Sequence, residues 1–197
     1  MKKVNIPVEV SARHIHLSKN DLEKLFGKGY ELKPEKSLSQ PGEFAAEETV
    51  DLVYGKQKMH EVRIIGPVRK ASQIELSLTD AYKLGLRELP RLRVSGHTMG
   101  SIKIRVVGPK ATIKVPCIVP QRHIHMSKKK AKKLNIKDKQ KFYVEVPGKR
   151  EVIFSKVIVR VSEEFKTSMH LDTDEGNAAG IINGKGKGKI LLENEEE

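Results

Sequence analysis

The segment SARHIHLS, residues 11–18, recurs as PQRHIHMS, residues 120–127. Side chains of an extended strand alternate between its two faces, so two histidines separated by one residue point the same way. Each copy therefore predicts a strand that aims two imidazoles at one point, as a metal ion requires. Two copies in matched contexts indicate two metal sites and a chain built from two related halves.

Each copy also predicts a short helix after it. Ser18 is a favourable N-cap with Asp21 three residues later, and Ser127 stands in the same place before a lysine-rich run. A further helix is expected in the first half, before a glycine. The expected helices span residues 21–26, 79–84 and 128–134.

The remaining segments are mostly short apolar runs separated by turn signals such as Pro147-Gly148. Short strands at this spacing favour barrels over a parallel sheet with long crossovers. We therefore expect a mainly β protein with two small β-barrel domains and short flanking α-helices, related by internal duplication. The polar residues 31–48 are expected to form a loop or a lid, and residues 172–177 an acidic loop.

The composition is typical of an intracellular protein. A chain of 197 residues with 38% hydrophobic residues can bury a core without disulfides. Its single cysteine, Cys117, excludes a disulfide within the chain and fits a reducing cytosol. No apolar run approaches the ~20 residues of a membrane span, and residues 1–7 lack the apolar core of a signal peptide. We expect a cytoplasmic protein that does not associate with a membrane.

The chain carries a formal net charge of +13. Such an excess suits nucleic acid, an anionic small molecule such as phosphate, or simply a lysine-rich solvated surface. Aromatic residues make up 5% of the chain and tryptophan is absent, so stacking platforms for single-stranded nucleic acid are poorly supplied. The low aromatic content therefore counts against single-stranded nucleic acid, and both an anionic small molecule and a solvated lysine-rich surface remain compatible with the charge.

The repeat extends beyond the paired histidines. QIELSLTD, residues 73–80, and SMHLDTDE, residues 168–175, share an apolar residue, a ligand-type residue and a leucine in the same order. Glu75 and His170 occupy the same place in this pattern, which makes them equivalent third ligands. The two predicted metal sites are His14, His16 and Glu75, called the first triad, and His123, His125 and His170, called the second triad.

Three nitrogen and oxygen ligands that leave positions open for water or substrate are the arrangement of catalytic zinc. Cobalt, nickel and iron accept the same donor types. The residues also allow another interpretation, an ancient duplication whose histidines now only form hydrogen bonds. Arg69 lies six residues before Glu75, and its guanidinium is a natural fork for phosphate. Cys117 lies in an apolar strand and is expected to be a buried structural thiol.

Four blocks together resemble the phosphate propanoyltransferases of the PduL type, over about residues 4–192. They are SARHIHLS, GPVRKASQIELSLTDAYKLG, PQRHIHMS and MHLDTDEGNAAG. The resemblance implies two β-barrel domains, here residues 13–119 and residues 1–12 with 120–197, and a dinuclear zinc site between them. It also implies that the first strand joins the barrel of the C-terminal half, and that the protein is a homodimer.

The resemblance also assigns roles to single residues. Both triads match the zinc ligands of the family, and Arg69 matches the phosphate-binding arginine. The positions that match contacts to coenzyme A are Ser11, Lys36, Arg63 and Asn177. Members packed into bacterial microcompartments carry an amphipathic N-terminal extension. Val4 already begins the first strand here, so a free cytoplasmic enzyme is expected.

Family members transfer an acyl group between coenzyme A and phosphate. The expected reaction is a direct attack of phosphate on the thioester of acetyl- or propanoyl-coenzyme A, assisted by two zinc ions and Arg69. One alternative is a dinuclear zinc hydrolase with the same ligands, in which a hydroxide attacks. A second is a basic barrel that binds RNA around structural metals. The expected partners are acyl-coenzyme A, phosphate and a second copy of the chain, without nucleic acid.

Overall fold

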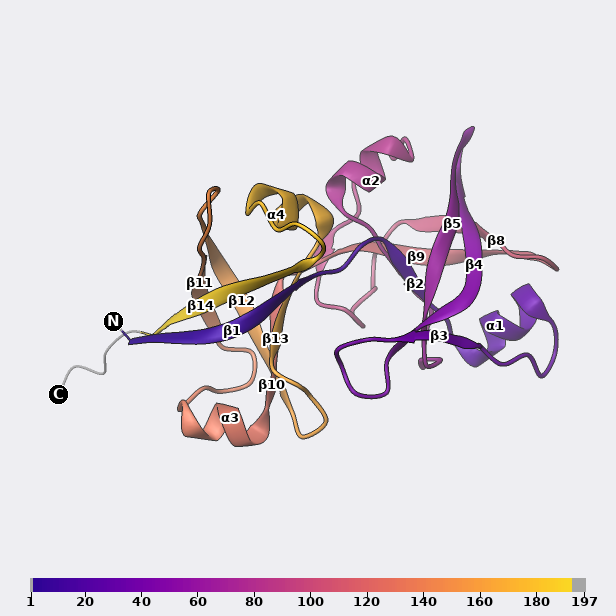
Figure 1. Ribbon diagram of the computed structural model, residues 1–197. Coiled ribbons are helices and arrows are strands. Elements are labelled where there is room, and N and C mark those ends of the chain that lie inside the picture. The colour runs from indigo at the N-terminus through magenta and orange to yellow at the C-terminus, as the bar shows by residue number, and fades with distance from the viewer. Residues whose placement is uncertain (1, 193–197) are drawn as a thin grey trace. The chain divides into compact units, whose positions relative to one another are not determined.

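The computed structural model describes residues 2–192, which form two compact units made mainly of β-strands (Figure 1). Residues 12–120 form one unit, called the N-terminal barrel. Residues 2–11 and 121–192 form the other, called the C-terminal barrel. Residue 1 and residues 193–197, which the sequence analysis assigned to the second domain, lie outside the described part of the chain.

The N-terminal barrel is a closed ring of six strands. In ring order these are β4 (Phe44–Tyr54), β5 (Gln57–Gly66), β2 (His14–His16), β6 (Gln73–Glu75), β9 (Thr112–Pro120) and β8 (Lys103–Val107). Outside the ring, one edge strand pairs with β4 and another with β9; they are β3 (Pro34–Ser37) and β7 (Leu92–Arg93). The helices of this unit are α1 (Lys19–Phe26) and α2 (Leu78–Lys83).

The C-terminal barrel is a second closed ring of six strands. In ring order these are β11 (Lys141–Val146), β12 (Val152–Ser162), β10 (His123–Ser127), β13 (Ser168–Leu171), β1 (Lys2–Val10) and β14 (Lys185–Leu192). Its helices are α3 (Lys128–Lys133) and α4 (Thr173–Ala178). The two rings repeat the same order of parallel and antiparallel pairs, so the prediction of two related barrels is confirmed.

The strand that precedes each histidine pair belongs to the barrel of the other half. β1 comes directly before β2 in the chain, yet it pairs with β13 and β14 in the C-terminal barrel. β9 comes directly before β10, yet it pairs with β6 and β8 in the N-terminal barrel. The two repeats have therefore exchanged their first strands.

The central residue of each histidine pair anchors its strand in a barrel core. Ile15 is fully buried and lies opposite Ile64 on β5 and Ile74 on β6. Ile124 is fully buried in the same way, opposite Val159 on β12. Because neighbouring side chains of a strand point to opposite faces, the histidines beside each isoleucine face away from the core.

Helices α1 and α3 begin at the caps that the sequence predicts. Ser18 accepts a hydrogen bond from the Asp21 amide at 3.2 Å, and Ser127 accepts one from the amide of Lys130 at 3.3 Å. These hydrogen bonds satisfy amides that the first turn of a helix leaves unpaired. Within residues 2–192, no helix is both long enough and apolar enough to span a bilayer.

Two expectations about loops were wrong. Residues 173–177 lie in α4 and Asp172 is its N-cap, instead of forming an acidic loop, because Asp172 and Glu175 form a reciprocal capping box. Residues 31–48 contain β3 and the beginning of β4 instead of a continuous loop or lid. Pro34 is compatible with β3 because this strand lies at the edge of its sheet, where a missing amide donor costs little.

The strand exchange predicts that a substitution in β1 destabilises the C-terminal barrel. Val8 is 1% exposed within that core, so Val8→Asp should lower the free energy of unfolding by about 3 kcal/mol or more, since it buries an unpaired charge. Limited proteolysis with mass mapping should show new cleavage within residues 121–192 and little change within residues 12–120. Asn5→Asp, at an exposed position of the same strand, is the control. Cleavage confined to residues 12–120 would contradict the assignment.

Candidate metal centre

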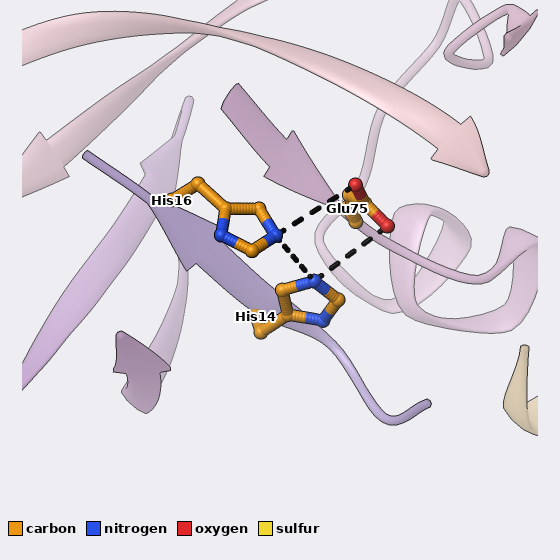
Figure 2. Close-up of side chains that lie close together, drawn as sticks. All are labelled: His14, His16 and Glu75. Carbon is orange, nitrogen blue, oxygen red and sulfur yellow. Dashed lines mark hydrogen bonds and ion pairs between the residues drawn. The ribbon is translucent and has the colours of Figure 1, made fainter. Parts of the chain in front are cut away.

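The first triad lies on the antiparallel pair β2 and β6 (Figure 2). His14 is directly opposite Glu75, and His16 follows two residues along the same face. The Nε2 atoms of the two histidines are 3.2 Å apart, and Glu75 carboxylate oxygens lie 3.6 Å and 4.0 Å from them. Among residues 2–192, these side chains are the one group of at least three His, Cys, Asp or Glu residues whose ligand atoms all lie within 4.8 Å of one another.

Backbone carbonyl groups orient both imidazoles. His14 Nδ1 lies 2.8 Å from the carbonyl oxygen of Ala12, and His16 Nδ1 lies 3.2 Å from that of Ile65. A proton on each Nδ1 is donated to these oxygens, which leaves the lone pair of each Nε2 directed at the centre of the triad. This arrangement is typical of metal-binding histidines, whose second nitrogen is held by a carbonyl or a carboxylate.

The electrostatics of the first triad favour a neutral His16 and an ionised Glu75. Burial, with help from the nearby charges of His14 and Arg69, holds the pKa of His16 well below its usual value. Burial alone would raise the pKa of Glu75, but the two histidines, a hydrogen bond from Ser95 and the charge of Arg69 lower it to about 2. Metal ions bind neutral imidazole and ionised carboxylate, so the pKa shifts of His16 and Glu75 favour the forms that bind a cation.

The spacing of the donor atoms also fits a metal ion. Zinc binds nitrogen and oxygen at about 2.0–2.2 Å in a tetrahedral arrangement, which places neighbouring ligand atoms about 3.3–3.6 Å apart. The separations of 3.2–4.0 Å between His14, His16 and Glu75 need only small adjustments to reach this geometry. The residues of the first triad therefore fit a zinc ion with one position left for substrate.

Two residues that the sequence analysis missed hold the Glu75 carboxylate. Gln73 donates from Nε2 to Glu75 Oε1 and to Ser95 Oγ, the latter at 2.7 Å. The amide of Gly96 in turn donates to Gln73 Oε1 at 2.8 Å, which fixes the orientation of the side chain. Gln73 stands two residues before Glu75 on the same strand face, and this spacing could have predicted the contact from the sequence. Ser95 lies 22 residues from Gln73 in the chain, and no sequence pattern indicates its contact with this site.

Arg69 is connected to the first triad through Ser95. Its Nη1 donates to Ser95 Oγ at 3.2 Å, and its Nη2 donates to Glu43 Oε1 at 3.0 Å. Its backbone amide donates to the carbonyl of Leu17 at 2.8 Å, which attaches this segment to the end of β2. The guanidinium is thus held near Glu75 and is about one-third exposed, so it is accessible to an anion.

The second triad lies at the matching place of the C-terminal barrel. His123 on β10 is directly opposite His170 on β13, as His14 is opposite Glu75. The ring centroids are 4.7 Å apart for His123 and His125, 4.8 Å for His125 and His170, and 5.3 Å for His123 and His170. His123 Nδ1 lies 2.9 Å from a backbone carbonyl oxygen two residues before it, which matches the orientation of His14.

Two neighbours of His170 were not foreseen from the sequence. Its Nε2 lies 2.9 Å from Ser168 Oγ and 3.8 Å from Glu9 Oε2. Glu9 reaches this position because β1 pairs with β13 and places it directly opposite His170. The second triad, which is entirely imidazole, therefore has a carboxylate beside it.

The four positions that the resemblance matched to coenzyme A are divided between the two units. Arg63 lies opposite His14 on β5, donates to the carbonyls of Ala46 and Glu47, and forms an ion pair with Glu35 at 2.8 Å. The others are Lys36, exposed on β3; Ser11, whose amide donates to Leu171 at 2.8 Å; and Asn177, exposed on α4. Arg63 is thus the member of this set directly beside a ligand of the first triad.

Cys117 lies on β9 opposite Ile74 and is fully buried in the N-terminal barrel. Burial raises the pKa of its thiol, and the nearby negative charge of Glu75 raises it further. A nucleophilic cysteine requires the thiolate form and access to the substrate. The position of Cys117 provides neither.

Residues 7–182 match the family model for phosphate propanoyltransferase. The chain is 51% identical over 183 residues to the phosphate propanoyltransferase of Lachnoclostridium phytofermentans, a match that covers 91% of this chain and 84% of that protein. It is 47% identical over 186 residues to the enzyme of the same name from Thermotoga maritima, covering 93% of this chain and 88% of the relative. The corresponding Salmonella typhimurium protein is 46% identical over 186 residues, covering 93% and 87%.

The burial of Cys117 predicts an inert thiol. In the native protein at pH 8, a thiol reagent such as 5,5′-dithiobis(2-nitrobenzoate) should label less than about a tenth of the chains, because the thiol is buried and protonated. Labelling should approach one thiol per chain in denaturant. The variant Cys117→Ala should retain turnover. Fast labelling of the native protein, or loss of turnover in the variant, would contradict a purely structural role.

Proposed function

Because the chain belongs to the phosphate propanoyltransferase family, we propose that it transfers a short acyl group, propanoyl or acetyl, between coenzyme A and inorganic phosphate. In the balanced reaction, acyl-coenzyme A and phosphate give acyl phosphate and coenzyme A. The observation that carries the proposal is the family match, which spans both histidine pairs and both third ligands.

The proposal includes one metal ion in each triad, with zinc as the metal that best suits the donors. The support for the first ion is the geometry of His14, His16 and Glu75. The support for the second is the equivalent placement of His123 and His170 in the other barrel. Bound zinc supplies Lewis-acid polarisation of the thioester carbonyl and stabilises a thiolate.

In the proposed mechanism, Arg69 binds phosphate. Its planar guanidinium can donate two parallel hydrogen bonds to two phosphate oxygens and offset their negative charge. In the structure this fork already holds a carboxylate oxygen of Glu43, and phosphate would replace that partner. Ser95 keeps its contact with Nη1 and so maintains the direction of the side chain.

The acyl transfer is proposed to be direct. A phosphate oxygen attacks the thioester carbonyl carbon, the new carbon–oxygen bond forms, and the carbon–sulfur bond breaks with the electron pair leaving on sulfur. Arg69 stabilises the oxyanion that develops on the carbonyl oxygen. No acyl-enzyme is required, which is consistent with the burial of Cys117.

We assign the binding of coenzyme A to four cationic and polar side chains. They are Ser11, Lys36, Arg63 and Asn177. Arg63 lies beside His14 and presents a guanidinium to anionic groups, although Glu35 occupies it in the structure. The active form is proposed to be a homodimer that does not bind nucleic acid.

The test of the proposed function is the phosphate dependence of coenzyme A release. Purified protein is incubated with acetyl- or propanoyl-coenzyme A with and without phosphate, and free thiol and acyl phosphate are measured. Transfer predicts release only with phosphate and an equal yield of acyl phosphate. Release without phosphate would instead identify a hydrolase with the same ligands. Tight, salt-sensitive RNA binding that survives His123→Ala would favour the RNA-binding alternative.

Removal of the Arg69 guanidinium should specifically impair the use of phosphate. Arg69→Ala is expected to lower kcat/KM for phosphate about 100-fold, because one preorganised anion donor is lost. Its metal content, measured by elemental analysis, should match that of the wild type. Arg87→Ala, an exposed arginine of the same barrel, is the matched control. Unchanged kinetics for phosphate would rule out the assigned role.

Single ligand substitutions should remove one metal ion each. The wild type is expected to hold two metal ions per chain, and His14→Ala and His123→Ala should each hold one, because each loses a ligand of a three-ligand site. Elemental analysis after exhaustive dialysis measures the ratio of metal to chain. His60→Ala, an exposed histidine outside both triads, should leave two. If His123→Ala also retained two, the second triad would not be a metal site.

A further inference from the structure

In both barrels, two of the metal ligands form the last pair of a very short strand ladder. The ladder between β2 and β6 has three pairs, and His14 with Glu75 is the terminal one. The ladder between β10 and β13 also has three pairs, and His123 with His170 is the terminal one. Ends of secondary-structure elements open more readily than their middles, so a ligand pair at this place needs additional support.

In the N-terminal barrel, an ion pair closes the open end of this ladder. Arg13, the residue before His14, donates from Nη1 to Asp80 Oδ1 at 3.1 Å. Asp80 lies in the first turn of α2, and its amide donates to Oγ of the N-cap Ser77, two residues after Glu75. Arg13 is thereby connected to the segment that follows the third ligand.

The C-terminal barrel has the same connection with different residues. Arg122, the residue before His123, donates from Nη1 to Glu175 Oε1 at 2.7 Å. Glu175 lies in the first turn of α4 and shares a capping box with Asp172, the N-cap two residues after His170. Arg122 also donates from Nε to the carbonyl of Ser155 at 2.9 Å, which fixes its direction.

The two connections follow one rule of position. In each repeat the arginine stands immediately before the first histidine, the N-cap stands two residues after the third ligand, and the acidic residue stands five residues after it. The acid is Asp in one copy and Glu in the other, and the cap is Ser in one and Asp in the other. Both repeats form this ion pair although the residue types of the acid and the cap differ. This indicates that the ion pair itself has the same structural role in both barrels.

We propose that Arg13 and Arg122 are positioning residues of the two metal sites, each of which holds the terminal ligand pair of its own barrel together. The inference rests on the proposed metal sites, and it adds residues that contact neither metal nor substrate. Each arginine acts through the acidic residue of the helix that follows the third ligand, Asp80 on α2 or Glu175 on α4. This contact fixes the distance between the paired histidines and the third ligand.

The acidic partners of the two arginines are largely buried, so removal of either arginine should be costly. The Asp80 side chain is 6% exposed, while the Arg13 side chain is 45% exposed. Within the described part of the chain, the other carboxylate oxygen of Asp80 is buried without a hydrogen-bond partner, so loss of Arg13 leaves a shielded charge unpaired. The Glu175 side chain is 17% exposed, and its pair with Arg122 has the shorter distance.

The experiment measures metal affinity at one site at a time. His123→Ala isolates the first site and His14→Ala isolates the second, and zinc dissociation constants are obtained by competition with a chelating dye. In the His123→Ala background, Arg13→Met should weaken zinc binding about tenfold, in the range known for residues that support metal ligands from outside. In the same background, Arg122→Met and the exposed control Arg87→Met should change it less than twofold. In the His14→Ala background, Arg122→Met should be the variant that weakens binding.

A second design guards against a merely unfolded variant. The double variant Arg13→Asp with Asp80→Arg reverses the ion pair and should restore most of the zinc affinity that Arg13→Met loses. Circular dichroism should show that this double variant and Arg13→Met are both folded. A wild type without bound zinc would overturn the proposed metal sites and this inference with them. A zinc-binding wild type whose affinity is unchanged by Arg13→Met, or equally reduced at both sites by either arginine variant, would overturn this inference alone.

Discussion

The two-residue period of a strand is the constraint on which both candidate metal sites depend. Ile15 and Ile124 are completely buried, so their strands cannot rotate without removing a large apolar side chain from a barrel core. The flanking histidines are consequently held on the opposite face, two residues apart along the ladder. The third ligand is placed by register, since Glu75 and His170 are directly opposite the first histidine of each pair. Core packing and ligand geometry are therefore fixed by the same residues.

Features that repeat within the chain could be predicted from the residues, and the resemblance implied that the first strand joins the other barrel, whereas the side-chain contacts that this exchange creates could not be predicted. The mainly β fold and the two barrels followed from short apolar runs and from the doubled motif. Glu9 was missed because its contact with His170 depends on β1 pairing with β13, far away in the chain. Ser95 was missed because its segment has no counterpart in the motif. The helix after Asp172 was missed because an acidic run was interpreted by composition, although its cap spacing was present.

The two triads are related by position but differ in charge. In the first triad a carboxylate completes the set, and its low pKa keeps one negative charge against a divalent ion. The second triad offers three imidazoles, and Oε2 of Glu9 lies 3.8 Å from His170 Nε2. A carboxylate ligand offsets more of the metal charge than a neutral imidazole does, so the two sites would polarise bound groups to different extents. In the proposed reaction, polarising a neutral thioester carbonyl and stabilising an anionic thiolate require different metal charges. Two sites that differ in ligand charge would suit these two roles.

The exchanged first strands have a consequence for the origin of the chain. Each repeat lacks one strand of its own barrel and supplies one to the other, as in a domain-swapped dimer. A single repeat, as an independent chain, could keep this exchanged arrangement only by pairing with an identical copy. The present molecule then corresponds to such a dimer whose two genes have become one, with residues 108–111 as the covalent link between the former subunits. Fusion freed the two copies to diverge, which is how one ancestral ligand set could become a carboxylate site and an imidazole site.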